Sequence, residues 1–311
     1  MSQAEHNADH SDETATDVEP VTARSIALMT NDPERFHVAL HGLRRVVRLP
    51  DDADGVGVGT SVDTSVLLSR KPTVPQKWSL ARMVGPLKGR CTVVQVRKKG
   101  DIRPRQASAA NLGPFRHRHL TLAHVGGPDT VDAAASNTEF WLSGLPDFLL
   151  RSREGKTEGE AFFLALLHAM HEGGCLERDV HGKRLIDVAR EVMAKDPLRC
   201  PRSFSLATGL EHVTLAHQMQ TCVLQMNGLL DDDADDVDPT YTDTSMGRER
   251  LRRFRATLVL GGVEPPVERP PALPDGTRAH FHREDVGVCV GRDLEPQVQP
   301  IQLGERGARN G

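Results

Sequence analysis

The sequence of 311 residues has few cysteines, and they are poorly placed for cross-linking or for zinc. Their number is odd and no two form a Cys-x-x-Cys pair, which excludes an evident disulfide framework or zinc knuckle. We predict five free thiols and no metal or other cofactor. The cysteines are Cys91, Cys175, Cys200, Cys222 and Cys289.

The sequence also lacks the features of membrane, secreted and nucleic-acid-binding proteins. No apolar run is long enough to cross a bilayer, and the acidic first residues lack the basic start and apolar centre of a secretory signal. A formal net charge of −4 gives no electrostatic reason to expect nucleic acid or an anionic membrane as partner. We therefore predict a cytoplasmic protein.

Three further clusters suggest chemistry only weakly. His117-x-His119 and His280-x-His282 place two imidazoles on one strand face, but neither pair has an evident third metal ligand. The acidic run at 231–238 lacks the glycine and the bidentate glutamate of an EF-hand loop. The basic run at 248–255 has no interleaved aromatics. A metal site, a calcium loop and a nucleic-acid surface are therefore not expected here.

The order of elements indicates an α+β protein. Strands, then helices, then strands again favour layered sheets over alternating β-α-β units. We expect strands at 24–30, 64–71, 91–98, 119–126, 203–209, 211–226, 255–262 and 278–285, a turn at 51–60, and helices at 33–49, 157–174 and 183–195. Thr157 and Glu160 have capping-box spacing at the start of the second helix. We expect a disordered leader at 1–22, one domain at 23–294 and a flexible tail at 295–311.

Several short stretches occur in an order that resembles the class II glutamine amidotransferases of the N-terminal-nucleophile hydrolase superfamily, in particular the small stand-alone bacterial type. They are Ala23-Arg24 with "ALMTNDPERF" at 27–36, "DGVGVG" at 54–59, "VVQVRK" at 93–98, "NLGPF" at 111–115, "LAHVGG" at 122–127 and "KTEGE" at 156–160. The resemblance covers nearly all of the expected domain. It implies a four-layer αββα sandwich of two antiparallel sheets.

The resemblance also implies a set of catalytic parts. In the family, a thiolate at the free N-terminus attacks the glutamine amide and the α-amine is the general base. An asparagine side chain and a glycine N–H bind the oxyanion, an arginine grips the substrate carboxylate, and an aspartate receives its amine.

In this sequence the family pattern is only partly kept. Ala23 stands at the nucleophile position and Val125 at the oxyanion asparagine, so neither catalytic side chain is present. The arginine is kept as Arg97, the aspartate is lengthened to Glu158, and Gly126 and His124 are kept. The resemblance therefore implies a domain without glutaminase activity.

The positions with altered residues differ in kind from those that are kept. The kept residues that look architectural are Arg24, Asp54, Gly55, Gly57, Gly59, His124, Gly126, Thr157 and Glu160, and the loop motif retains Asn111, Pro114 and Phe115. Altered positions include Val56 in place of the turn tryptophan, Gln95 and Leu112-Gly113 in place of histidine and Thr-His, and Gly159 in place of serine. Conformational demands explain the kept glycines.

Three hypotheses remain open from the sequence. The first is an inactive domain kept for binding, as a scaffold or for regulation, with an amino-acid-like ligand between Arg97 and Glu158 or a protein partner. The second is an active amidohydrolase on glutamine or γ-glutamyl amides with a processed nucleophile such as Thr22. The third is a structural subunit whose pocket is filled by Val56 and Val125.

Overall fold

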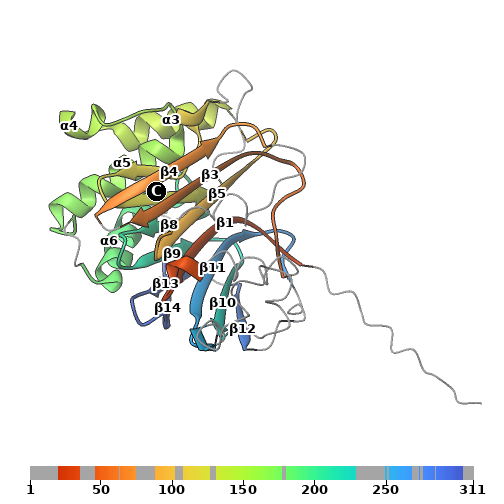
Figure 1. Ribbon diagram of the computed structural model, residues 1–311. Helices are drawn as coiled ribbons and strands as arrows, with labels where there is room; N and C mark the ends of the chain where they lie inside the picture. The colour runs from red at the N-terminus through yellow and green to blue at the C-terminus, as the bar shows by residue number, and fades with distance from the viewer. Residues whose placement is uncertain are drawn as a thin grey trace, which may run out of the picture.

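In the computed structural model, the described parts of the chain form two stacked β-sheets with helices on one side (Figure 1). These parts are residues 20–35, 46–62, 64–74, 88–101, 108–126, 131–176, 180–228, 249–250, 252–267, 273, 276–283 and 285–303. No helix within these ranges combines the length and apolar character needed to cross a membrane.

The larger sheet contains the strand that carries Ala23. Its strands run in the order β12-β10-β11-β1-β5-β3-β4, all antiparallel, and a short β2 pairs in parallel with the start of β1. Their bounds are β1 (Val21–Thr30), β2 (Val47–Arg48), β3 (Ala53–Val62), β4 (Ser65–Lys71), β5 (Cys91–Lys98), β10 (Thr221–Asn227), β11 (Arg255–Val263) and β12 (Thr277–His282).

The smaller sheet carries the expected oxyanion position. Its order is β14-β13-β9-β8-β7-β6, again antiparallel. The strands are β6 (Phe115–His117), β7 (Leu120–Val125), β8 (Ser203–Ala207), β9 (His212–Ala216), β13 (Val286–Val290) and β14 (Pro296–Pro300).

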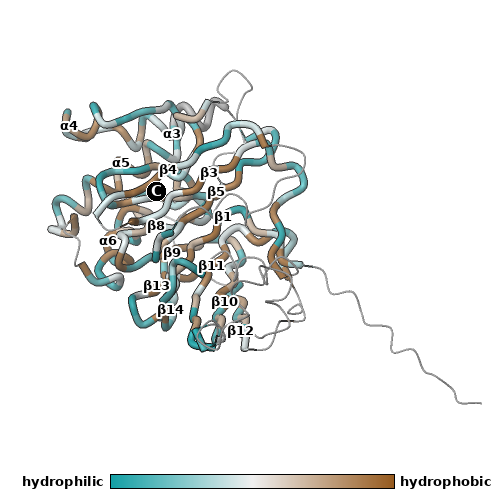
Figure 2. Tube along the Cα trace, viewed as in Figure 1, coloured by the Kyte–Doolittle hydropathy of each residue, from teal (hydrophilic) through white to brown (hydrophobic). Residues whose placement is uncertain are grey.

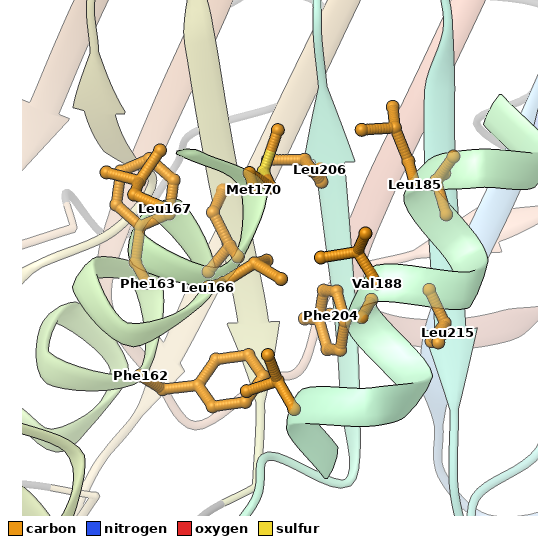
Figure 3. Close-up of a cluster of buried hydrophobic side chains, with 14 of the residues drawn as sticks. Phe162, Phe163, Leu166, Leu167, Met170, Leu185, Val188, Phe204, Leu206 and Leu215 are labelled. Atoms are coloured by element: carbon orange, nitrogen blue, oxygen red, sulfur yellow. The ribbon is translucent and has the colours of Figure 1, made fainter. Parts of the chain in front are cut away.

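Among the described residues, α-helices lie on the outer side of the smaller sheet, where α5 (Glu158–Glu172) and α6 (Gly182–Lys195) cover the sheet and α3 (Val131–Leu142) and α4 (Asp147–Leu150) pack against α5 (Figure 1). Figure 3 shows the side chains of α5 and α6 meeting Phe204 and Leu206 of β8 and Leu215 of β9. Phe162 and Phe204 lie with ring centroids 5.2 Å apart. Large apolar side chains therefore fill the layer between helices and sheet.

The layer between the two sheets is made of smaller side chains. Alanine and valine dominate its apolar cluster, including Ala27, Val93, Ala123 and Val259. Several serine and threonine side chains are also fully buried, among them Ser25, Ser203 and Thr214. Hydrophobic residues are concentrated along the strands in Figure 2. Small side chains allow the sheets to approach closely, so the layer depends on exact complementarity.

The expected sandwich is confirmed for its two antiparallel sheets and for the helical layer on one side. An apolar cluster that includes Ile26, Leu28 and Val58 covers the other face of the larger sheet. The predicted helix at 33–49 would cover this face, but residues 36–45 lie outside the described parts. Its described ends are a 3-10 turn η1 (Pro33–Arg35) and β2. A second 3-10 turn, η4 (Ala109–Asn111), precedes β6.

The structure corrects four sequence-based boundaries. The expected turn at 51–60 is mostly β3, where glycines allow close approach to neighbouring chain segments. The single strand expected at 211–226 is two strands, separated by a turn in which Gln218 has a φ of +56°. β1 begins at Val21, inside the expected leader, and β14 at 296–300 lies inside the expected tail, where it pairs with β13.

Candidate functional site

Ala23 lies near the start of β1 and is fully buried. It pairs with Val263 of β11. The strand continues upstream of it, because Val21 N donates to Val46 O over 2.7 Å and Glu264 N donates to Thr22 O over 3.1 Å. The backbone nitrogen of Ala23 is therefore part of a continuous strand, and its methyl group offers no nucleophile.

Val125 lies on the opposite sheet, next to the same end of β1. A Cβ added at Gly262, which has a φ of +67°, would lie 2.7 Å from the Cγ1 atom of Val125 and 3.2 Å from the Cβ of Arg24. Gly262 precedes Val263, the partner of Ala23. The two altered positions therefore lie at the same end of the sheets, but Val125 faces Gly262 and Arg24 from the smaller sheet, whereas Ala23 packs in the apolar cluster on the other face of the larger sheet.

Gly126 follows Val125 and has a φ of +81°, which favours glycine. A Cβ at this position would also lie 2.9 Å from the Cβ of Arg202. Backbone conformation and crowding both explain why glycine stands here, whether or not its N–H serves a ligand.

Arg97 lies at the end of β5, at the same end of the larger sheet. The register of β1 with β5 places Gln95 opposite Ser25, whereas the side chain of Ala23 packs with Val56 and Val96 in the apolar cluster on the other face of the larger sheet. The Nε of Arg97 donates to Asp54 Oδ1 over 2.6 Å, and its Nη2 donates to Pro72 O over 2.8 Å. Its Nη1 has no hydrogen-bond partner among the described residues. Most of the guanidinium is thus already engaged.

Glu158 is the first residue of α5. Its Oε1 accepts a hydrogen bond of 3.0 Å from Asn137 Nδ2 of α3. Burial raises the pKa of the Glu158 carboxyl to about 7, and the bond from Asn137 opposes this rise in part. A carboxyl that is half protonated near neutral pH is a weak counter-ion for an amine.

His124 contacts the N-terminal turn of α5 from β7. A Cβ added at Gly159 would lie 1.9 Å from His124 Nε2, and the His124 ring stacks on Phe115 with centroids 5.9 Å apart. Burial lowers the pKa of His124 to about 4. His124 is therefore a neutral packing residue at pH 7 and fills the space that a side chain at 159 would need.

Gln95 links the two sheets at the replaced loop motif. Its Oε1 accepts a hydrogen bond of 3.1 Å from His124 N on β7. A Cβ at Gly113 would lie 1.9 Å from the same oxygen. The two replacements, glutamine at 95 and glycine at 113, therefore fit each other sterically and close this side of the site.

The motif at 111–115 and the motif at 156–160 contact each other, and the second also contacts the loop that precedes it. Asn111 Oδ1 accepts from Lys156 N over 2.8 Å. The carboxylate of Glu160 accepts from Glu154 N and Gly155 N over 2.7 and 2.8 Å, while Glu160 N donates to Thr157 Oγ1 over 3.4 Å. The threonine half of the capping box is confirmed, but the glutamate binds the preceding loop instead of the Thr157 backbone.

The site end of the sheets is thus closed by its own side chains. Ala23, Val125 and Arg97 are 0, 1 and 4% exposed. A small pocket with room for about one water molecule lies elsewhere, between Arg70, Arg116, Glu154 and Glu160.

The cysteines offer no substitute nucleophile. All five are buried free thiols. Burial raises the pKa values of Cys91, Cys200, Cys222 and Cys289 to about 12, whereas a nucleophilic cysteine needs a depressed pKa. Within the described ranges, no three His, Cys, Asp or Glu side chains gather into a group that could hold a metal ion.

Two contact residues were missed by the sequence interpretation. Asp54 had been expected to be architectural, and it is the partner of Arg97. Asn137, which bonds to Glu158, lies in helix α3, which was not expected. The position of Asp54 in "DGVGVG" was a usable signal, because β3 pairs with β5 beside Arg97. No comparable signal marked Asn137.

Solved structures similar to this chain are glutamine amidotransferase proteins. A glutamine aminotransferase class-II domain protein from Silicibacter pomeroyi is 13% identical, with a TM-score of 0.47 over 89% of this chain and 99% of that one. A predicted glutamine amidotransferase from Pseudomonas aeruginosa is 14% identical, with a TM-score of 0.40 over 89% and 90%. Glutamine phosphoribosylpyrophosphate amidotransferase from B. subtilis is 12% identical, with a TM-score of 0.44 over 90% of this chain and 49% of its own length.

These likenesses carry no residue roles to this chain. The identities are 12–14% and the TM-scores are below 0.5. The chain spans about half the length of the B. subtilis enzyme. No protein-family model and no curated protein sequence matches the chain significantly.

Proposed function

We propose that this chain is a class II glutamine amidotransferase-like domain without glutaminase activity, kept for a binding, scaffold or regulatory role. The observation that carries the proposal is the environment of Ala23. This residue is fully buried within a strand that continues upstream through Val21 and Thr22. Amide cleavage by this superfamily needs a side-chain nucleophile with a free α-amine beside it, and neither is provided here.

The second observation that supports the proposal is the valine at the position where an oxyanion-binding asparagine is expected. Val125 occupies the expected oxyanion position and packs against Gly262. Loss of one oxyanion donor costs other enzymes about 3–4 kcal/mol of transition-state stabilisation. Restoring a nucleophile alone would therefore leave a poor catalyst.

The arrangement favours a scaffold role over binding of an amino acid between Arg97 and Glu158. Arg97 is already bonded to Asp54 and Pro72. The raised pKa of Glu158 makes it a weak anion at neutral pH. An amino-acid ligand would have to displace a hydrogen-bond partner of Arg97 and ionise the carboxyl of Glu158. Both requirements lower the affinity for the ligand.

The alternative that Thr22 becomes a nucleophile after cleavage is less favoured. Cleavage before Thr22 would remove Val21, which is fully buried and bonded to Val46. Successive side chains of a strand also point to opposite faces, so Thr22 faces away from the side of Ala23. Thr22 would have to shift by one residue in register to replace it.

Ammonia release tests the proposal directly. The purified chain is incubated with glutamine, next to Ala23→Cys as a matched variant, and ammonia is followed with an enzyme-coupled assay. We expect no release above the buffer rate from either protein, because Ala23→Cys restores sulfur without a free α-amine. Release that persists through repeated purification of the unaltered chain contradicts the proposal.

Calorimetry distinguishes the roles within the proposal. Glutamine and glutamate are titrated into the chain and into Arg97→Gln at pH 7. A scaffold predicts no heat of binding from either protein. Saturable binding that Arg97→Gln abolishes would instead show that Arg97 still holds an amino-acid carboxylate. Intact mass of the purified chain separately tests cleavage near residues 21–24.

A further inference from the structure

His212 is the first residue of β9 and lies in the layer between the two sheets. It pairs with Ala207 of β8 on one side and with Val290 of β13 on the other. Both partners belong to the apolar cluster between the sheets, and residues directly opposite each other in a sheet point to the same face. The imidazole of His212 therefore faces the larger sheet and not the helices.

The surroundings of His212 suit a neutral ring and not a charged one. The residue is 0% exposed, and neither Nδ1 nor Nε2 has a hydrogen-bond partner among the described residues. Protonation would give the ring a charge and two N–H donors, and a buried charge without a partner is costly. The closed layer therefore opposes protonation of His212.

The titratable groups near His212 give it no counter-ion. Cys91 of β5 lies at this end of the larger sheet, where burial raises the pKa of its thiol to about 12, although a bond to the Gly209 backbone opposes the rise. This thiol stays neutral in acid. Glu211 lies on the helix side, where its Oε2 accepts a hydrogen bond of 2.5 Å from Gly182 N. Successive side chains of a strand point to opposite faces, so Glu211 points away from the His212 ring.

The turn that joins β8 to β9 encloses this end of the layer. Thr208 N donates to Glu211 O over 2.9 Å, and Thr208 Oγ1 lies 3.2 Å from both Glu211 O and Glu211 N. Glu211 also holds Gly182 N, at the first residue of α6. Because His212 follows this turn directly, opening of the turn at 208–211 would expose the ring to water.

Proton binding to His212 therefore favours the open turn. Burial lowers the pKa of His212 from 6.5 to about 3 in the closed chain, whereas an exposed ring has the ordinary value. Above pH 6.5 the ring is neutral in both states, and the stability of the closed turn is fully present. As pH falls from 6.5 toward 3, the open state binds a proton that the closed state does not, so opening becomes more favourable by up to about tenfold per pH unit.

We propose that neutral His212 keeps the turn at 208–211 closed, and that protonation of its ring in acid opens this turn and releases the start of α6 from Glu211. This response to acid lies at the opposite end of the sheets from Ala23, beside the pair of Met29 with Cys91. It is independent of the proposed lack of glutaminase activity, since no residue of the candidate site takes part.

Urea unfolding between pH 7 and pH 4 tests the role of His212. The variant is His212→Leu, which keeps an apolar side chain in the layer and cannot be protonated. His171→Leu, at an exposed position near the end of α5, gives the baseline for loss of a histidine at each pH. From pH 6 to pH 4, we expect the folding equilibrium constant of the unaltered chain to fall by up to about tenfold per pH unit more than that of His212→Leu.

Native-state hydrogen exchange locates the opening. The amides of Thr208 and Gly182 report on the turn and on the start of α6, and the amide of Ala27 in β1 reports on the core. After correction for the intrinsic rates, we expect opening at Thr208 and Gly182 to increase more than tenfold from pH 7 to pH 5 in the unaltered chain. Opening at Ala27 should increase less, and His212→Leu should lose most of the increase at the turn.

Equal pH dependence in the unaltered chain and His212→Leu overturns the proposal, and so does an equal increase in exchange at Thr208, Gly182 and Ala27. If His212→Leu does not fold, His212→Gln takes its place, because an amide does not titrate in this range. An NMR titration of the unaltered chain gives a separate answer. Protonation of His212 near pH 6.5, with the turn amides still protected, refutes the proposal.

Discussion

Arg97 and Asp54 form a close ion pair across adjacent strands, with Arg97 Nε 2.6 Å from Asp54 Oδ1. The arginine side chain is 5% exposed and the aspartate side chain 36% exposed. The guanidinium also packs over Gly55, where an added Cβ would lie 2.8 Å from Nη2. Asp54 and Gly55 therefore fix the position of the Arg97 guanidinium.

Asp54→Ala should destabilise the fold, because it leaves a nearly buried guanidinium with fewer partners. Hydrogen bonds to charged groups contribute about 1.5–3 kcal/mol, and we expect a loss in the free energy of unfolding within that range. Asp51→Ala is the control, since its pair with Arg48 is more than half exposed on both sides and should matter by less than about 1 kcal/mol. If urea unfolding shows the same loss in the free energy of unfolding for Asp54→Ala and Asp51→Ala, the Arg97–Asp54 pair does not stabilise the fold.

Glu158→Gln should remove part of the pH dependence of stability. The folded pKa of about 7 lies above the ordinary value of 4.5, so the folded state holds a proton that the unfolded state releases between these values. The unaltered chain therefore loses stability as pH rises from about 4.5 to about 7. The melting temperature of Glu158→Gln, relative to the unaltered chain, should be higher at pH 8 than at pH 4.5.

Glu191→Gln is the control for this titration, because Glu191 lies exposed on α6. The difference in melting temperature between Glu191→Gln and the unaltered chain gives the baseline for loss of a glutamate at each pH. A difference for Glu158→Gln that follows this baseline would mean that Glu158 ionises normally in the folded state.

Gly159→Ala should destabilise the contact between α5 and β7, because the new methyl group would overlap His124 Nε2. Overpacking of this kind costs about 1–3 kcal/mol. The cost should be smaller in a His124→Ala background, giving a coupling of at least about 0.5 kcal/mol in a double-mutant cycle. Additive effects in thermal or urea unfolding would place the two residues out of contact.

A chain beginning at Ala23 should be less stable than one beginning at Pro20. The two chains differ by Pro20, Val21 and Thr22, of which Val21 and Thr22 pair with Val47 and Arg48. Burial of a valine side chain contributes about 1.5–3 kcal/mol, and we expect a loss of at least that size in urea unfolding. Equal stability of the two chains would make cleavage before Ala23 feasible and would weaken the case against processing.

Local sequence patterns determined much of the architecture. The strand-like run at 91–98 predicted β5 correctly, and β5 is buried on both faces. The helical spacing of apolar residues at 157–174 predicted α5 correctly, since that spacing reports a buried helix face. The turn predicted at 51–60 failed because glycines there serve close packing within a strand. A Cβ at Gly57 would lie 1.8 Å from Gly113 O, a contact between residues far apart in the sequence.

The sequence by itself determined that Ala23 carries no nucleophile and that Val125 carries no amide, because a side chain's chemistry is independent of the fold. Only the tertiary structure decided that both residues lie at one end of the sheets and that Asp54 accepts a hydrogen bond from Arg97. It also decided that burial raises the pKa of Glu158. Distance and desolvation arise from segments far apart in the chain, so no local pattern could contain them.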